Sequence, residues 1–600
     1  MRPQRKTYSP RIITGFTDIR RNDEVQHQNN SIKNKPYRVP KKFKCCENIV
    51  VGNGIMFKSL EDNSTIGFLK LSKNQEMEYS TDQNTWFSFQ EDTVLTLNND
   101  EIVYVRGVLT SDNSMYEYTQ FKLNGKLSVS GDIKNISNYK NLNSPLKPYC
   151  FYSLFQATRD EVKDDEGKVT AINYYDNGLV DASELILSEK YLVNYCYGSM
   201  FRNCTNLSKI PNLPATHLAA SCYRNLFREC HNLSEAPELP ATTLSEYCYA
   251  YMFFGCSNLT KVPDELPAMT LVDYCYYQMF RGCTSLKTAM DILPATTLAS
   301  NCCYGMFYDC TSLTQTPELP ATKLSEWCYG YMFGKCTSLT TTTHELSATT
   351  LADYCYKQMF QDCTSLTSAP ELPAMTLAEY CYQGMFLGCT SLTETPELPA
   401  TTLAIGCYQS MFSNCLNLKT AMDILPALDL LETKWTLAGY KTHVSNYANI
   451  NDSRVVSEGV YYGMFYGCKN LTTAPILPAK QLTPGCYNSM FHNCTKLTKI
   501  IILAENLHVN ITDEDFNTVV ELANDYGGEA NRDWMELNAG VCWIEHSGKI
   551  PTRKFYVPES AVNDWKTITE YFTHVYDEDI EILTQEEIDT IVERYNIVYN

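Results

Sequence analysis

The sequence predicts an α/β repeat solenoid of about 13 coils, flanked by an N-terminal all-β domain and a C-terminal mixed α/β cap. Three observations support this fold class. One pattern of residues recurs every 26 or 27 positions, apolar and polar residues alternate before it, and the recurrence stops beyond Ala504. A fixed period of this length indicates stacked units that bury their apolar faces against their neighbours.

Each repeat has the form C-Y-x-x-M-F-x-x-C-T-S-L-T-x-x-P-E-L-P-A-T-T-L-A, and one phenylalanine anchors it. The anchors are Phe201, Phe227, Phe253, Phe280, Phe307, Phe333, Phe360, Phe386 and Phe412, and then Phe465 and Phe491. The gap of 53 residues after Phe412 predicts a degenerate copy near Trp435 to Tyr440. An earlier copy, Cys150 to Phe155, is followed by a 20-residue insertion.

We expect the first part of each repeat to be an amphipathic helix of two to three turns. At 100° per residue, Cys355, Tyr356, Met359, Phe360 and Cys363 fall on one arc of about 140°. The positions between them vary among copies and would point the other way. This arc would face the neighbouring coils.

The remainder of the repeat, T-S-L-T-x-x-P-E-L-P, is too short and too rich in proline for a second helix. Proline has no N–H group for a ladder, so any strand here must be very short. We expect a narrow, frequently interrupted parallel ladder. The recurring prolines are Pro211, Pro237, Pro263, Pro317, Pro370, Pro396 and Pro475.

Most of the 26 cysteines form two columns, one at each end of the expected helix. We interpret them as small buried hydrophobic residues where coils approach closely. Metal binding would need paired ligands such as C-x-x-C, and a helix would separate the two sulfurs of one repeat by roughly 12 Å. The sequence therefore predicts neither a metal site nor a bound cofactor.

An aromatic residue precedes the first cysteine in seven copies, where helical geometry would place it outside the buried arc. The candidate binding residues are Tyr149, Tyr195, Tyr247, Tyr274, Trp327, Tyr354 and Tyr380, with Tyr251 and Tyr331 one turn further along. Aligned exposed rings can form a binding stripe, because rigid amphipathic rings bind at low entropic cost. The alternative is that these rings only pack between adjacent repeats.

Both flanks lose the repeat. Segments such as GIMFKSL, EIVYVRGVL and LSVSGDI alternate between turn residues and predict a small sandwich or barrel. Beyond the repeats, Thr512 to Asp515 resembles a helix N-cap, and Thr584 to Glu587 is a capping box. The predicted divisions are an arm at 1–47, a β domain at 48–145, a solenoid at 146–503 with the degenerate copy and an insertion at 427–459, and a cap at 504–600.

The net charge of -20 argues against a chain-wide nucleic-acid or anionic-membrane partner. Residues 1–47 differ, because they carry 12 Lys or Arg against 4 Asp or Glu. We expect an extended basic arm that anchors the chain to a partner. Its candidate contact residues are Arg2, Arg5, Lys6, Arg11, Arg20, Arg21, Lys41, Lys42 and Lys44.

No apolar stretch follows the basic start, and no segment approaches 18 apolar residues. We therefore expect no export by a signal peptide, no membrane insertion, and thiols that stay reduced in a cytosol. No Walker loop, H-E-x-x-H or G-x-S-x-G occurs. Remote residues can still assemble a catalytic site, but the sequence favours a non-enzymatic protein without catalytic residues.

The repeat pattern, as at Leu372 to Thr393, resembles the BspA-type leucine-rich repeat, which is common in Bacteroidales surface proteins and in viruses of those bacteria. Two flanking segments agree with this. Tyr79 to Trp86 resembles the β module that often precedes such arrays, and Phe555 to Val562 resembles the step that closes them. The resemblance implies a leucine-rich-repeat solenoid, horseshoe-like or rod-like, with a role in adhesion or assembly and no catalytic residues.

Cellular members of this family carry an export signal, whereas this chain starts with a basic arm. The combination resembles a virion structural protein of a crAss-like tailed phage that infects Bacteroidales. The first reading is a head fibre or capsid decoration protein, made in the host cytoplasm and located in the virion. Its arm would bind other virion proteins, its repeats a host surface glycan or protein, and it would form a dimer or trimer. Other readings are a tail fibre or receptor-binding appendage, and an intracellular protein-binding scaffold.

Overall fold

The computed structural model describes residues 54–157, 159–163, 169–174, 177–187, 190–342, 345–426, 459–480, 482, 487, 489–505, 553–564, 580–595 and 597. The chain divides into two compact units, Met1–Val50 and Val51–Asn600. All the described residues belong to the second unit. The expected basic arm, with its nine candidate contact residues, lies outside the described residues.

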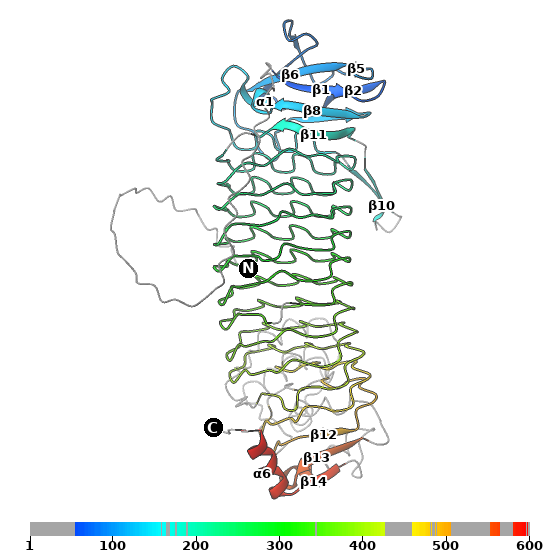
Figure 1. The fold of residues 1–600 in the computed structure, drawn as a ribbon, viewed down its shortest axis with the longest axis vertical. Helices are drawn as coiled ribbons and strands as arrows, with labels where there is room; N and C mark the ends of the chain where they lie inside the picture. The colour runs from blue at the N-terminus through cyan, green and yellow to red at the C-terminus, as the bar shows by residue number, and fades with distance from the viewer. Residues whose placement is uncertain are drawn as a thin grey trace, which may run out of the picture. The chain divides into compact units, whose positions relative to one another are not determined.

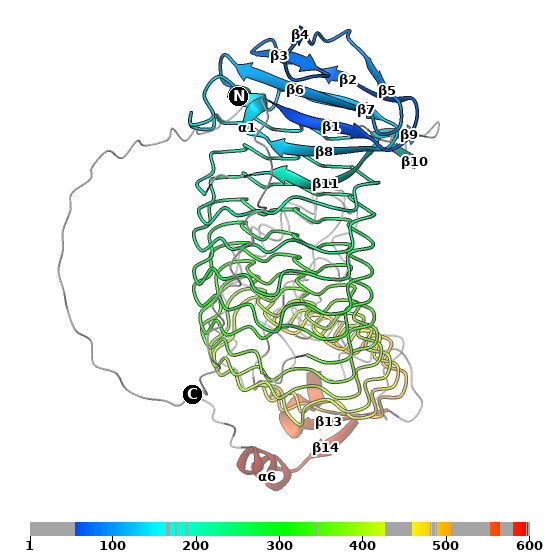
Figure 2. The same ribbon diagram turned by 45° about the horizontal axis from the view of Figure 1, so that its top comes forward.

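The strands of the N-terminal region occur where the alternation of apolar and polar residues predicts them. They are β1 (Ile55–Ser59), β2 (Ser64–Lys70), β3 (Gln75–Ser80), β4 (Phe87–Ser88), β5 (Leu95–Leu97), β6 (Ile102–Leu109), β7 (Gln120–Asn124) and β8 (Leu127–Asp132). Most of them form one larger sheet, while β5, β2 and β7 form a second, three-stranded sheet (Figure 2). The rings of Phe57 in β1 and Phe121 in β7 lie 5.3 Å apart between the sheets. The two sheets therefore share a core, as in a sandwich.

One strand connects this sandwich to the repeats. β11 (Leu179–Ile186) pairs in parallel with β8, and its Asp181 forms a parallel bridge with Lys209 in the next coil. A short helix, α1 (Lys134–Asn138), follows β8. The predicted insertion contains an antiparallel pair, β9 (Arg159–Lys163) and β10 (Val169–Tyr174). The sheet of the sandwich thus continues directly into the ladder of the repeats.

Single parallel bridges link neighbouring repeats, as between Gln315 and Thr341, and between Thr376 and Thr402. The predicted narrow and interrupted parallel ladder is confirmed. Figure 1 shows the coils following one another from β11 to β12 (Lys499–Ile501).

The predicted amphipathic helix is wrong. In the coil that begins at Tyr354, φ is positive at Tyr354 (59°), Gln358 (52°) and Asp362 (57°). A left-handed residue at every fourth position is incompatible with a right-handed helix of L residues. The N–H of Met359 donates to the carbonyl oxygen of Tyr356, three residues back, at 3.1 Å. Each repeat therefore starts with consecutive tight turns, which we call the turn run.

Alternate N–H groups of the turn run leave the coil. The N–H of Tyr356 donates to the carbonyl of Cys381 at 3.0 Å, and that of Phe360 donates to Met385 at 2.9 Å, both in the next coil. An α-helix bonds its N–H groups within itself, so it has none to offer a neighbouring coil. The turn run replaces the expected helix because it links coils through half of its N–H groups.

The predicted burial pattern is nevertheless confirmed. Cys355, Tyr356, Met359, Phe360 and Cys363 are all buried, and the residues between them are half-buried. Two buried residues alternate with two outward residues in a period of four. Over nine residues this period differs little from the 3.6 of a helix, which explains why the two structures share one sequence pattern.

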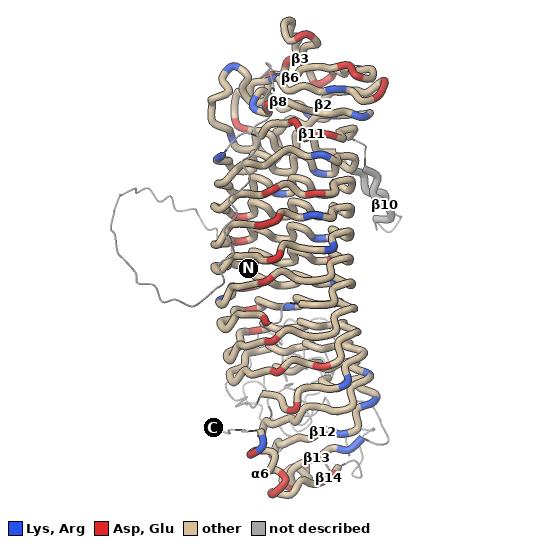
Figure 3. Tube along the Cα trace, viewed as in Figure 1, with Lys and Arg blue, Asp and Glu red and all other residues tan. Residues whose placement is uncertain are grey.

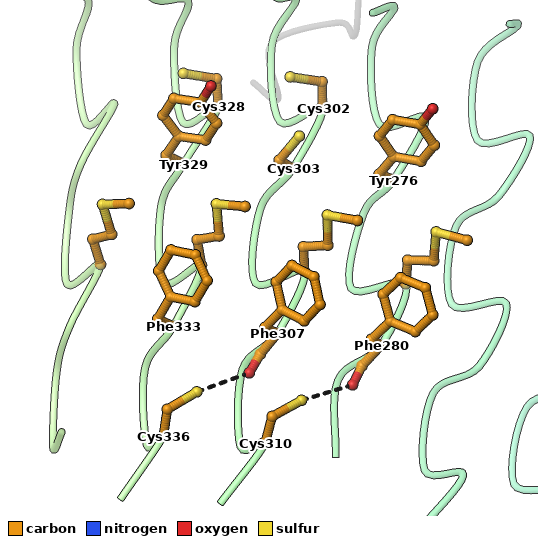
Figure 4. Packing of buried hydrophobic residues seen from close by; sticks show 14 of the residues in the cluster. Tyr276, Phe280, Cys302, Cys303, Phe307, Cys310, Cys328, Tyr329, Phe333 and Cys336 are labelled. Atoms are coloured by element: carbon orange, nitrogen blue, oxygen red, sulfur yellow. Dashed lines mark hydrogen bonds between the residues drawn. The ribbon is translucent and has the colours of Figure 1, made fainter. Parts of the chain in front are cut away.

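The buried side chains form continuous columns. Anchor phenylalanines of successive coils stack with ring centroids 5.4 to 5.9 Å apart from Phe155 to Phe491 (Figure 4). Phe412 stacks directly on Phe465 at 5.7 Å. The described residues thus contain twelve stacked anchors, and the degenerate copy expected near Trp435 does not stand between these two coils. That segment itself lies outside the described residues.

The C-terminal region extends the ladder. β12 pairs in parallel with β13 (Lys554–Pro558), and β13 with β14 (Ile580–Leu583). The segment expected to close the array, Phe555 to Val562, supplies β13 and the 3-10 turn η3 (Glu559–Ala561). It therefore forms the next rung of the stack.

The predicted capping box at Thr584 is confirmed. The Thr584 side chain accepts the N–H of Glu587, and the Glu587 carboxylate accepts the N–H of Thr584 at 2.8 Å, at the start of α6 (Gln585–Arg594). The other predicted N-cap, Thr512 to Asp515, lies outside the described residues. Arg553 is buried and donates to the carbonyl oxygens of Cys494 and Leu497 at 2.8 and 2.9 Å.

Candidate functional site

The outward residues of the turn runs line up in columns, because each run is hydrogen-bonded in register to the next. We call this surface the turn face. It consists of the positions equivalent to Tyr354, Lys357, Gln358, Gln361 and Asp362 in every coil, and each column is named after its member in this coil. The left-handed backbone recurs at the Tyr354, Gln358 and Asp362 positions.

All seven predicted aromatic residues before the first cysteine lie in the Tyr354 column, half-buried and in the left-handed conformation. Neighbouring rings stack face to face. The pairs and their centroid distances are Tyr149–Tyr195 at 4.6 Å, Tyr247–Tyr274 at 4.5 Å, Trp327–Tyr354 at 4.5 Å and Tyr354–Tyr380 at 5.1 Å. Each ring covers a face of its neighbour, so within these pairs the ring edges are the parts left for a ligand.

The column is interrupted where the sequence has a small residue. Ser221 separates Tyr195 from Tyr247, and Asn301 separates Tyr274 from Trp327. Side chains of the Lys357 column reach these places. The Arg224 guanidinium lies 5.1 Å from the centroid of Tyr247, and the Tyr304 ring lies 5.8 Å from that of Trp327.

The other predicted residues, Tyr251 and Tyr331, lie in the Gln358 column. Tyr251 contacts Tyr277 in the next coil at 5.3 Å, and Tyr331 contacts Tyr304 at 5.4 Å. The structure thus gathers aromatic residues from three columns onto the middle coils. The sequence analysis missed four half-buried members, Phe254, Tyr277, Tyr304 and Tyr308, because each stands at a position that varies between copies.

Cations lie over the rings of these middle coils. Arg228 lies 4.3 Å from the centroid of Phe254, Arg281 lies 4.7 Å from Tyr308, and Lys357 lies 4.8 Å from Trp327. Such contacts stabilise each cation by about 0.5 to 2 kcal/mol and hold it in place. The turn face therefore combines fixed aromatic rings with fixed positive charges.

Burial keeps the tyrosine hydroxyls of this surface protonated. It raises the pKa of Tyr304 to about 12 and raises the pKa of Tyr331, so both are neutral hydrogen-bond donors at neutral pH. Burial also lowers the pKa of Lys357 below the ordinary lysine value. The surface offers neutral hydroxyls and cations, which can bind a ligand but do not form a nucleophile.

The two cysteine columns lie behind the turn face. In the described part of the chain, 22 cysteines are free and buried. Burial raises the pKa of Cys248 and Cys355 to about 12, which disfavours the reactive thiolate. No group of three or more potential metal ligands occurs among the described residues.

This fold defines a solenoid repeat protein. The BspA type leucine rich repeat region matches the chain in six copies, over residues 183–314, 300–424 and 445–524. Because the match covers more than half of the sequence, the chain belongs to the BspA type leucine rich repeat family. No curated protein matches the chain. Among the described residues, no helix has the length and apolarity needed to cross a membrane.

Proposed function

We propose that this chain is a non-enzymatic virion structural protein, a head fibre or capsid decoration protein, and that its turn face attaches the particle to a host surface. The observation that carries the proposal is the gathering of rigid aromatic rings and fixed cations on one face of the middle coils. Tyrosine, tryptophan and arginine dominate the energetics of binding surfaces, because they bring large contact areas at low entropic cost.

The basic arm supports attachment to a particle. Residues 1–47 have an excess of 8 positive charges in a chain whose net charge is -20. A polar, basic segment of this kind folds on a partner, where its ordering entropy is offset by contacts. In this proposal the arm binds other virion proteins and the repeats remain free for a host glycan or protein. We also propose a homodimer or homotrimer, to be measured by light scattering.

The intracellular protein-binding scaffold is the alternative from another class. The 22 free buried cysteines favour it to the extent that they suit a reducing compartment. A tail fibre would use the same turn face as a head fibre and differs only in its place on the particle.

The experiment is mass spectrometry of purified particles, with the full chain and a variant lacking residues 1–47. We expect the full chain in the particle, and a folded but unincorporated deletion variant. Circular dichroism of the free variant checks its fold. Absence of the full chain from particles would reject the virion role in favour of the scaffold. Normal incorporation of the deletion variant would reject the anchoring role of the arm.

A further inference from the structure

Five cations share one part of the turn face, and four of them belong to positions that no repeat pattern would single out. Arg224, Arg228, Arg281, Lys335 and Lys357 each lie within 6 Å of the centroid of a half-buried ring. Figure 3 shows acidic residues recurring along the coils with basic residues between them. We call the surface from Arg224 to Lys357 the cationic patch.

We propose that the cationic patch binds an acidic polysaccharide, a polymer of sugars that carry carboxylate or sulfate groups. This inference rests on the proposed adhesive role of the turn face and names the ligand class. It requires that the cations keep free donors, that their spacing suits a polymer, and that the surrounding surface does not attract anions by itself.

The stacked guanidinium groups keep donors available. Arg228 lies over Phe254 at 4.3 Å and Arg281 lies over Tyr308 at 4.7 Å. A guanidinium stacked on a ring keeps its N–H groups in its own plane, directed past the ring edge, where they form the fork that suits a carboxylate or sulfate. The Nε of Arg224 is buried without a hydrogen-bond partner among the described residues, so this guanidinium has an unsatisfied donor.

The spacing of the cations suits an extended polymer. Arg228 follows the anchor of one coil, Arg281 follows the anchor two coils further on, and Lys335 stands two coils beyond that. Two coil steps correspond to about 10 Å if the coils are spaced like neighbouring strands. A ligand with acidic groups repeated along one direction can therefore contact all three cations, whereas a single small anion can contact only one.

Carboxylates border the patch and restrict where an anion can bind. Glu229 lies 3.9 Å from the Nε of Arg228, and Glu246 and Asp273 are exposed beside the Tyr354 column. With a net charge of -20, the chain as a whole repels polyanions. Binding of an acidic polymer would therefore depend on these particular cations. The neutral hydroxyls of Tyr304 and Tyr331 add hydrogen-bond donors for sugar oxygens.

The test measures binding of the full chain to immobilised hyaluronan, which is carboxylated, to heparin, which is sulfated, and to neutral dextran. The variant Arg224→Gln/Arg228→Gln/Arg281→Gln removes three charges from the patch. The control Lys261→Gln/Lys287→Gln/Lys419→Gln removes three exposed charges from positions outside the turn runs. Circular dichroism and thermal melting confirm that both variants fold.

We expect wild type and control to bind at least one acidic polymer and not dextran, with affinity that falls as salt is raised. The patch variant should bind on the order of tenfold more weakly. Arg224→Lys/Arg228→Lys/Arg281→Lys should show an intermediate loss, because lysine keeps the charge but not the fork.

Equal weakening in the patch variant and the control would overturn the inference. So would tighter binding of the wild type to single-stranded DNA than to either acidic polymer. If neutral dextran binds and the patch variant retains that binding, the ligand class is wrong while an adhesive role stands. If no glycan and no host cell binds, the proposed adhesive function itself fails.

Discussion

The thiol of Cys310 donates a hydrogen bond to the main-chain carbonyl oxygen of Phe280, in the preceding coil, at 3.1 Å (Figure 4). The same contact recurs in eleven coils, with distances of 3.1 or 3.2 Å. The second cysteine column thus links coils as well as filling space. The spacing of the cysteines in the sequence predicts their burial but not this bond.

Stability should fall at alkaline pH because of these thiols. Burial raises the pKa of Cys248 and Cys355 from 9.0 to about 12. Below pH 9 both states hold the proton, and between 9 and 12 only the unfolded state loses it, which favours unfolding. Each thiol then lowers the unfolding free energy by about 1.4 kcal/mol per pH unit. Guanidinium midpoints at about pH 8 and about pH 10.5 should differ clearly. Equal midpoints would show that the thiols are not buried as protonated groups.

Two glycines of the turn run should respond differently to alanine. Gly406 has φ of 58°, and a Cβ there would overlap the ring of Tyr380. Gly282 has φ of 75°, and its nearest neighbours would be 3.7 Å from a Cβ. Gly282→Ala should cost about 1 kcal/mol for the left-handed backbone. Gly406→Ala should cost about 2 to 3 kcal/mol, because it also displaces a stacked ring. Thermal melting of both variants measures this difference, and equal losses would mean that the Tyr380 ring is not held in the stack.

The buried tyrosine column lacks one ring at Cys303. Tyr276 and Tyr329 stand on either side of it, and their hydroxyls are buried without a hydrogen-bond partner among the described residues (Figure 4). Elsewhere in the column, ring centroids of neighbouring coils are 5.7 to 6.0 Å apart. Cys303→Tyr should restore the column and raise the unfolding free energy by about 1 to 3 kcal/mol. Cys302→Tyr, in the cysteine column beside it, should destabilise the protein. A loss of stability in both variants would mean that the surrounding chain has already closed the gap.

Arg553 should hold the end of the stack together. Its donors satisfy two carbonyl groups of the last repeat, at Cys494 and Leu497. Arg553→Met leaves these buried acceptors without that donor and should cost about 2 to 3 kcal/mol. The matched variant Lys554→Met changes a half-exposed neighbour and should cost less than about 0.5 kcal/mol. Chemical denaturation distinguishes the two, and similar losses would show that the Arg553 bonds contribute little.

Much of the fold was predictable because apolar residues reveal which positions are buried, whatever backbone holds them there. The pattern at Cys355, Tyr356, Met359 and Phe360 suits both a helix face and a run of turns. The signal that separates the two is the residue at every fourth position. Gly282, Gly305, Gly384 and Gly388 occupy left-handed positions, as do many Asn and Asp residues, and such residues are rare in helix interiors.

The candidate site was predictable only in part. The Tyr354 column was recognisable because its aromatic residues recur in one position. The contacts of Arg281 with Phe254 and Tyr308 were not, because the three residues come from different repeats at positions without a recurring residue type. Only the in-register stacking of the coils, which depends on the alternate N–H bonds, brings them together.

The most direct test of the adhesive turn face compares binding and stability in one variant. Tyr247→Ala/Tyr274→Ala/Trp327→Ala/Tyr354→Ala removes the four central rings of the Tyr354 column. The control Met269→Ala/Met375→Ala changes two exposed residues outside the turn runs. Binding of labelled protein to host cells is measured well below the melting temperature of each variant.

We expect the four-ring variant to remain folded with a modestly lower melting temperature, because each lost stacking pair contributes about 0.5 to 1.5 kcal/mol. Its binding to host cells should fall by at least about tenfold, while the control binds like the wild type. A large loss of stability with unchanged binding would contradict the account and leave these rings as part of the stack alone.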